Sequence, residues 1–127
     1  MPIGVIVREK EGEKTPTRTF SKAQEKTVAK KTGGKTNPNS GATDFGGKAD
    51  VDVGHLISIE CKTKTTPSKS MSIKKEWLDK LRQEMVFDGN KYCSLAFNFG
   101  PNEENYFIID ENMFIILCEV LKNESSK

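Results

Sequence analysis

The sequence lacks the features that mark several protein classes. It has no apolar run near the roughly 20 residues that cross a bilayer. Met1–Val5 lacks a charged segment followed by an apolar stretch, so we expect no signal peptide. Three dispersed cysteines without CxxC spacing argue against a disulfide framework and a zinc site, and we expect Cys61, Cys93 and Cys118 to be buried, reduced thiols. These absences favour a cytoplasmic protein.

The length and composition indicate one globular domain. A chain of 127 residues can bury one modest core. The 35% of hydrophobic and 30% of charged residues are typical of a globular protein with a well-solvated surface. We expect a folded domain over 19–122, an N-terminal arm over 1–18 and a C-terminal tail over 123–127.

The net charge of +2 conceals an uneven distribution of charge. Residues 1–48 carry ten Lys and Arg against five Asp and Glu, whereas residues 86–127 carry three against seven. A basic half of this kind fits a surface that meets phosphate groups. A solvated helix surface is the alternative, because Lys-rich helices are common.

Hydrophobic periodicity predicts alternating helices and strands, which is typical of the α/β class. The helices are expected at 21–32, 73–87 and 111–122, and the strands at 48–53, 56–62, 92–99 and 106–109. Ser21 and Gln24 have the spacing of a capping box, and Pro16 is expected to break any helix before them. Asp110 is expected to cap the last helix.

The strand over 56–62 ends with charged residues on one face. Because strand residues alternate between faces, Ser58, Glu60 and Lys62 share one face and the apolar residues between them share the other. The apolar face is expected to meet the core. The strand therefore projects a carboxylate and an ammonium group side by side.

These residue types suit the hydrolysis of a phosphodiester. Asp50 and Glu60 could hold Mg²⁺ through oxygen, and the backbone carbonyl of Cys61 could complete the metal shell. Lys62 could orient a water molecule and stabilise transition-state charge. Glu-x-Lys is also common as a simple surface pair, and Asp52 is a second candidate for the role of Asp50.

The spacing of these residues resembles that of the PD-(D/E)XK nuclease superfamily, with Asp50 at the Asp position and Glu60-Cys61-Lys62 as the (D/E)XK motif. Within it the chain is most similar to phage and archaeal Holliday junction resolvases and to small phage endonucleases. The residues that carry this similarity are Gly33-Gly34-Lys35, Ser40-Gly41-Ala42, Lys48-Ala49-Asp50, Glu60-Cys61-Lys62-Thr63 and a helix like Lys75–Lys80. The similarity covers roughly residues 18–100, and it departs from the motif at Ala49, where the superfamily name has Pro.

The resemblance implies a restriction-endonuclease-like fold, in which helices flank a mixed sheet. It implies Mg²⁺-dependent cleavage of DNA, with Mn²⁺ as a substitute, and a substrate that is branched or a four-way junction. It also implies a helical carboxylate before the Asp, which Glu25 matches, although Glu25 could equally form an ion pair on a helix surface. A phage-encoded, prophage-encoded or archaeal origin would follow from the same resemblance.

Other polar residues are candidates for contact with DNA. They are Lys30, Lys31, Lys35, Ser40, Lys48 and Lys64. His55, the only histidine, is expected to be a turn residue rather than a catalytic base. A restriction-like or DNA-end nuclease on the same fold and a non-catalytic DNA-binding module remain alternative functions.

The register of the predicted hairpin decides whether Asp50 meets Glu60. A two-residue turn at Gly54-His55 would pair Asp50 with Ile59 and place it on the apolar face. A three-residue loop, Val53–His55, would pair Asp50 with Ser58 and place it beside Glu60. We predict the three-residue loop, or a bulge with the same effect.

The last predicted helix is apolar on nearly every side, so it needs cover from more than one direction. We expect residues 111–121, with Ile3, Val5 and Val7 of the arm, to contribute to a homodimer interface. The alternative is a helix fully wrapped by its own sheet.

Overall fold

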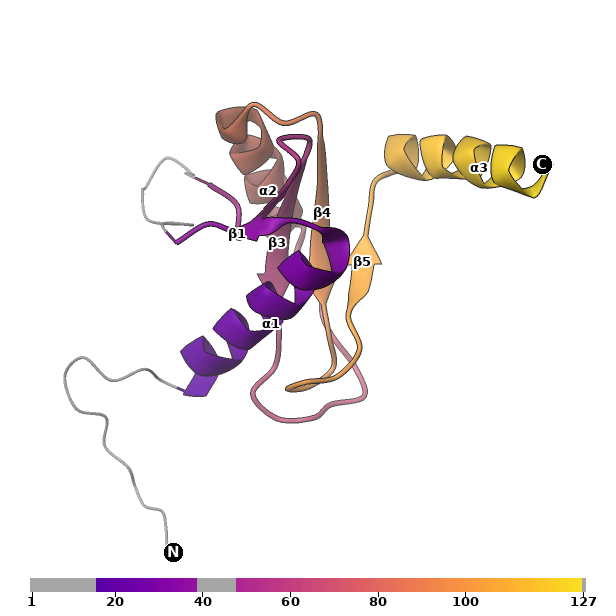
Figure 1. Ribbon diagram of the computed structural model, residues 1–127. Coiled ribbons are helices and arrows are strands. Elements are labelled where there is room, and N and C mark those ends of the chain that lie inside the picture. Colours follow the sequence, from indigo (N-terminus) through magenta and orange to yellow (C-terminus); the bar gives the residue numbers. More distant parts are fainter. Residues whose placement is uncertain (1–15, 39–47, 127) are drawn as a thin grey trace, which may run out of the picture.

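A computed structural model describes residues 16–38 and 48–126 of the chain (Figure 1). Its helices are α1 (Pro16–Thr32), α2 (Lys75–Asp88) and α3 (Glu111–Ser125). Its strands are β1 (Lys35–Thr36), β2 (Val51–Val53), β3 (Ile57–Lys62), β4 (Tyr92–Phe97) and β5 (Tyr106–Ile108). The α/β class is confirmed, and no described helix is both long enough and apolar enough to span a membrane. Ser40 and the apolar residues of the predicted arm (Ile3, Val5, Val7) lie outside the described ranges.

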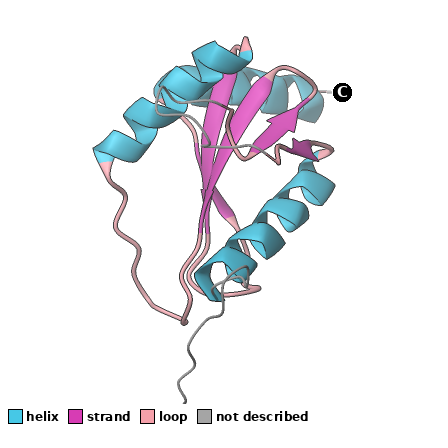
Figure 2. Cartoon of the chain, turned by 90° about the vertical axis from the view of Figure 1, so that its left-hand side faces the viewer, coloured by secondary structure: helices cyan, strands magenta, loops and turns pink. Residues whose placement is uncertain are grey.

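The strands form one mixed sheet in the order β1-β2-β3-β4-β5. β3 and β4 are parallel, and the other neighbouring strands are antiparallel. The parallel pair requires a crossover, and α2 supplies it. Figure 2 shows helices on both faces of the sheet. The predicted arrangement, a mixed sheet flanked by helices, is therefore present.

Each face of the sheet has its own core. On the α1 side the buried residues are Val28, Ala29, Val51, Ile59, Cys61 and Ala96. On the α2 side they are Ala49, Leu81 and Leu95, with Trp77 and Phe97 among the half-buried residues packed on them. Ile59 and Cys61 thus face α1, and strand alternation turns Glu60 and Lys62 toward α2.

The prediction that Pro16 breaks the first helix is wrong, since α1 begins there. Proline fits the first turn because its missing N–H would have no intrahelical acceptor and its φ suits a helix. Ser21 consequently lies within α1 rather than at its cap. The helix ends as predicted at Gly33, whose φ is +78°, and the Gly34 N–H bonds the Ala29 carbonyl at 2.8 Å.

The β2–β3 hairpin has a three-residue loop, Gly54–Leu56, which is one residue further along than predicted. Val53 pairs with Ile57, and Gly54 and His55 both have positive φ. The predicted boundaries of the loop are wrong because these two residues form the turn together with Leu56. The predicted consequence holds, since continuing the register from Val51↔Ile59 sets Asp50 opposite Glu60.

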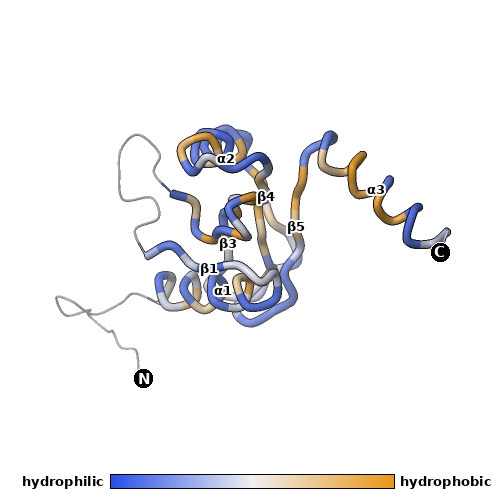
Figure 3. The backbone as a smooth tube through the Cα atoms, turned by 45° about the horizontal axis from the view of Figure 1, so that its top comes forward, coloured by the Kyte–Doolittle hydropathy of each residue, from blue (hydrophilic) through white to orange (hydrophobic). Residues whose placement is uncertain are grey.

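The helix α3 leaves the body of the molecule (Figure 1). Its N-terminus is capped as predicted, with Asp110 Oδ1 accepting from the Met113 N–H at 2.8 Å. None of its residues is buried, although its tube is largely coloured as hydrophobic in Figure 3. The alternative of a helix wrapped by its own sheet is therefore wrong for the described part of the chain.

Candidate active site

The candidate site lies where β3 outruns its neighbour β2. β2 begins at Val51, so the end of β3 has no antiparallel strand beside it. Asp50 fills this gap, and its Oδ2 accepts from the Cys61 N–H at 2.9 Å. In an extended strand the N–H and C=O of one residue point to the same side. The Cys61 carbonyl therefore points toward Asp50, as the sequence-based ligand set requires.

Asp50 and Glu60 form an electrostatically strained pair. Burial and the neighbouring Asp50 carboxylate raise the pKa of Glu60 to about 9, against an ordinary value of 4.5. Lys62 and Lys80 act in the opposite direction but do not offset this effect. The surroundings thus favour the neutral form of Glu60, and a bound proton or cation would relieve the repulsion between the two carboxyl groups.

Lys62 is held between an anion and an aromatic ring. Its Nζ lies 3.9 Å from Glu60 Oε2 and 4.6 Å from the centre of the Trp77 ring. Trp77 belongs to the α2-side core, as expected, and its ring also restricts the ammonium group. The geometry keeps Lys62 beside the carboxylates rather than extended into solvent.

Asp52 is committed to the hairpin. Its Oδ1 accepts from Asn90 Nδ2 at 2.6 Å, and its Oδ2 accepts from the His55 N–H at 3.0 Å. The His55 side chain is almost fully exposed at the turn. These bonds favour Asp50 over Asp52 as the site carboxylate, and they fit the interpretation of His55 as a turn residue.

Glu25 reaches the same site from α1. Burial, followed by the Asp50 carboxylate, raises its pKa to about 7, while the Lys22 ammonium acts to lower it. Glu25 also lines a polar hollow of about 170 Å³ with Arg18, Ser21, Lys22, Asn37 and Pro38. Glu25 therefore has both neighbours that the sequence analysis considered. One is the Asp50 carboxylate of the site, and the other is a lysine, Lys22, on the same helix.

Glu84 is a site carboxylate that the sequence analysis missed. Its side chain is 1% exposed, and its Oε1 has no hydrogen-bond donor among the described residues. Burial raises its pKa to about 7, while Lys80, 4.0 Å from its Oε2, and a hydrogen bond with Glu60 act to lower it. Its position follows Trp77 and Leu81 at helical spacing, which is the signal that could have placed it on the buried face of α2.

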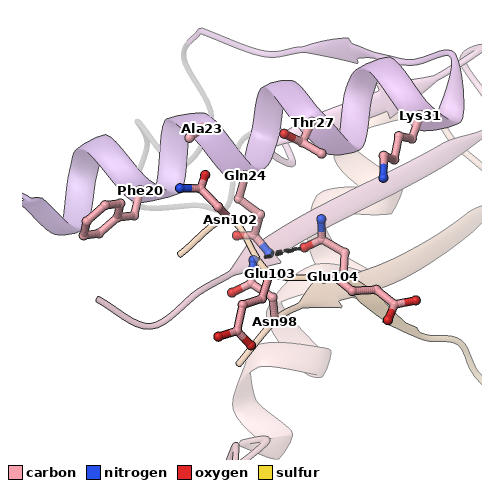
Figure 4. Close-up of a pocket in the computed structure, with 10 residues that line it drawn as sticks. Phe20, Ala23, Gln24, Thr27, Lys31, Asn98, Asn102, Glu103 and Glu104 are labelled. Carbon is pink, nitrogen blue, oxygen red and sulfur yellow. Dashed lines mark hydrogen bonds between the residues drawn. The ribbon is translucent and has the colours of Figure 1, made fainter. Parts of the chain in front are cut away.

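Gln24 ties α1 to the ends of the strands that carry the site. Its buried Nε2 donates to the Lys62 carbonyl at 2.8 Å and to Asn105 Oδ1 at 3.0 Å. It lines a polar cavity of about 220 Å³ between α1 and the segment 98–105 (Figure 4). Of the predicted site residues, only Lys31 lines this cavity. The cavity therefore lies beside the candidate site and is not part of it, and Gln24 supports the site from there.

The predicted DNA-contacting lysines do not form one cluster. Lys30 and Lys31 are exposed in the last turn of α1. Lys35 and Lys48 line a second hollow, with Asp52 and Asp88. Lys64 is used internally, since its Nζ donates to Ser68 Oγ and the Ser70 carbonyl. The basic residues that share a hollow with Glu25 are instead Arg18 and Lys22.

The three thiols are free, and only Cys61 is fully buried; Cys93 and Cys118 are half-buried. In the described ranges, no three His, Cys, Asp or Glu side chains are arranged to hold one metal ion. Comparisons with protein-family models, curated proteins and solved structures gave no match to this chain. Any assignment of function therefore rests on the residues and geometry described above.

Proposed function

We propose that this chain is a Mg²⁺-dependent DNA endonuclease of the PD-(D/E)XK type with a restriction-endonuclease-like fold. The observation that carries the proposal is the meeting of Asp50, Glu60 and Lys62 at the end of β3, beyond the start of β2. These residues match the superfamily motif in sequence, and the hairpin register turns them to one side of the sheet.

The chemistry of the site suits a hard cation. Two carboxylates and a carbonyl are the oxygen ligands that Mg²⁺ prefers, and Mn²⁺ accepts similar sets. Asp50, Glu60 and the Cys61 carbonyl would hold the ion, with water completing the shell. The raised pKa of Glu60 supports this fit, because burial beside Asp50 disfavours the ionised carboxylate and a bound cation would offset that cost. The buried Glu84 Oε1, which has no donor among the described residues, adds to the same effect. When bound, the ion would supply an acidified water and charge stabilisation.

The remaining residues have separate tasks in this proposal. Lys62, held by Glu60 and the Trp77 ring, positions the attacking water and stabilises negative charge that develops on the phosphate. Glu25 approaches Asp50 from α1 and orients the site from that side. Gln24 fixes α1 against the Lys62 carbonyl, so that both halves of the site keep their spacing.

DNA is the proposed substrate, and basic residues near the site would bind its phosphates. Arg18 and Lys22 stand beside Glu25. Lys30 and Lys31 at the end of α1, and Lys35 and Lys48 in a second hollow, are further candidate contacts in two separate places. Ser40 is retained as a candidate contact from the resemblance. The preference for branched DNA, and action in the cytoplasm of a bacterial host or an archaeon, also rest on the resemblance alone.

Cleavage of a supercoiled plasmid and of a synthetic four-way junction, each with Mg²⁺ and with EDTA, tests the proposal. We expect Mg²⁺-dependent nicks and a loss of at least about 1,000-fold in cleavage rate for Asp50→Asn and Lys62→Ala. Lys64→Ala is the matched control for the lysine, because its ammonium is bonded within the 63–72 segment.

Binding of the same DNA, measured by fluorescence anisotropy, separates the alternatives. The active-site variants should bind DNA almost as the wild type does, since they act on the cation and water. Binding without cleavage by the wild type would favour the non-catalytic module. Cleavage of linear ends in preference to junctions would favour a DNA-end nuclease.

A further inference from the structure

The α3 helix presents apolar side chains to solvent on two faces. One face carries Met113, Ile116, Leu117 and Val120, which repeat at helical spacing. The apolar surface continues around the helix through Phe114 and Leu121 to Ile115, which lies nearly opposite the first face, and each of these three is more than half exposed. A helix that is apolar on both faces needs cover on both in water, and the described part of the chain buries none of its residues.

A groove runs between α3 and the body of the molecule. Its walls are Leu56, Ile57 and Tyr92 on the body and Met113, Ile116, Leu117 and Val120 on the helix. Its volume is about 240 Å³, and every lining side chain except Tyr92 is purely apolar. Leu56, at the tip of the β2–β3 hairpin, is 42% exposed here. Because the groove and the helix beside it are both apolar and open, the helix of one copy could pack into the groove of another.

We propose that the groove is filled by α3 of a second copy of this chain, in a reciprocal two-fold exchange. Each α3 then uses one face to line its own groove and the other face to fill the groove of its neighbour. This arrangement is isologous, because the same surface serves both copies and the contact closes at two. It accounts for apolar residues on both faces of one helix, which a single contact would not.

The size and character of the surface favour a second copy over another occupant. Six apolar side chains of α3, and Leu56 on the groove wall, are each at least 40% exposed, which is a broad apolar surface of the kind that stable interfaces bury at roughly 800 Å² per partner. The groove offers no charged side chain that could select a partner reversibly. Permanently paired surfaces have this apolar composition, and a second copy is available whenever the chain folds.

Sedimentation velocity on the full chain, from about 1 to 100 µM, tests the proposal. We expect a dimer for the wild type. Leu117→Glu on the helix and Leu56→Glu on the body wall should each raise the dimer dissociation constant by at least about 100-fold. Val86→Glu is the matched control, because Val86 is 71% exposed on α2, outside the groove, and this variant should remain dimeric.

Three outcomes would overturn the exchange. They are a wild type that stays monomeric up to about 100 µM, a Leu56→Glu variant that dimerises normally, and a monomer that co-sediments with phosphatidylcholine vesicles. Circular dichroism shows whether the charged variants fold, and Leu117→Ala, which only shortens the side chain, should still weaken the dimer by about tenfold. The proposal stands apart from nuclease activity, since a catalytically dead Lys62→Ala variant should dimerise as the wild type does.

Discussion

The candidate site and α3 both depart from the usual placement of charged residues at the surface and apolar residues in the core, but in opposite ways. At the site, carboxylates are withdrawn from water: Glu84 is 1% exposed and Glu60 is largely buried. On α3, Phe114 and Leu121 are each more than half exposed. Buried charge and exposed apolar surface both cost stability, so neither is expected without a use. Both features agree with the proposals made above, namely that a cation binds at the site and that a second apolar surface covers α3.

The two regions also differ in whether other contacts offset this loss of stability. Around the site, hydrogen bonds hold the polar groups in place, as where the Cys61 N–H donates to Asp50 Oδ2 and Gln24 Nε2 donates to the Lys62 carbonyl. Around α3 no comparable support exists among the described residues, because the helix packs only weakly on the rest of the molecule. The polar groups of the site are therefore held in place by the fold, whereas the apolar side chains of α3 are left largely uncovered by the described residues.

The largest effect is expected for Glu60→Gln. This change removes the most strongly perturbed carboxylate but keeps its shape, so cleavage should fall by at least about 1,000-fold. The metal-free protein should melt no lower than the wild type, because the amide cannot ionise in a place that disfavours a charged side chain. Plasmid nicking and differential scanning calorimetry measure the two effects. Glu103→Gln, on an exposed loop, should change neither, and a Glu60→Gln variant that both unfolds and keeps its activity would reverse the interpretation of the site.

The next largest effect is expected for Gln24→Ala. The amide of Gln24 donates to the carbonyls of Lys62 and Ala96 and to Asn105, in buried or partly buried surroundings. Its loss removes these bonds and should lower the free energy of unfolding by about 2 kcal/mol. Urea denaturation measures it. Lys26→Ala, on the exposed side of the same helix, is the control, and equal losses in both variants would show that Gln24 does not anchor α1.

Local patterns predicted most of the elements but not their tertiary roles. The α2 helix, its end at Gly89 and the cap at Asp110 follow from periodicity and cap chemistry, which act within a few residues. Pro16 misled because proline is unfavourable inside a helix yet favourable in the first turn. The loop of the hairpin shifted by one residue because Gly54 and His55 both take positive φ, which an alternation of apolar residues does not reveal.

The site was only partly visible in the sequence for the same reason. Asp50, Glu60 and Lys62 stand out because the hairpin and strand alternation bring them together locally. Glu84 and Gln24 meet the site through packing between distant segments, and nothing near them in the sequence records those contacts. The exposure of α3 was likewise beyond sequence patterns, which show that a helix is apolar but not what covers it.

A smaller effect is expected for Glu84→Gln. Glu84 lies against Glu60 and would orient that ligand rather than hold the ion itself. Loss of such a supporting carboxylate should weaken Mg²⁺ binding by about tenfold. Isothermal titration with Mg²⁺ or Mn²⁺ in the absence of DNA measures this directly. Glu76→Gln, in the exposed first turn of α2, is the matched control. Unchanged affinity in Glu84→Gln would leave this carboxylate with no role at the site.

The smallest effect concerns pH, and it separates the two regions most directly. The pKa values of Glu60, Glu25 and Glu84 are about 9, 7 and 7, all above the ordinary 4.5. The folded protein thus binds more protons than the unfolded chain between these limits, and the stability of the metal-free protein must fall as pH rises. From pH 5 to 9 we expect its melting temperature to drop by at least about 5 °C, with Mg²⁺ reversing most of the loss.

The dimer dissociation constant, measured over the same pH range, is the control. The groove is lined by apolar side chains and Tyr92, so the dimer dissociation constant should change by less than about threefold where the melting temperature falls. Glu60→Gln should flatten the pH dependence of melting but leave the dimer untouched, because it acts on the site alone. If the metal-free protein instead became more stable with rising pH, the buried carboxylates would have to be ionised and compensated by groups of the chain itself. A cation would then have no charge to neutralise at the end of β3. The proposal of a metal site would fail, and α3 alone would remain as a region whose exposed surface needs a partner.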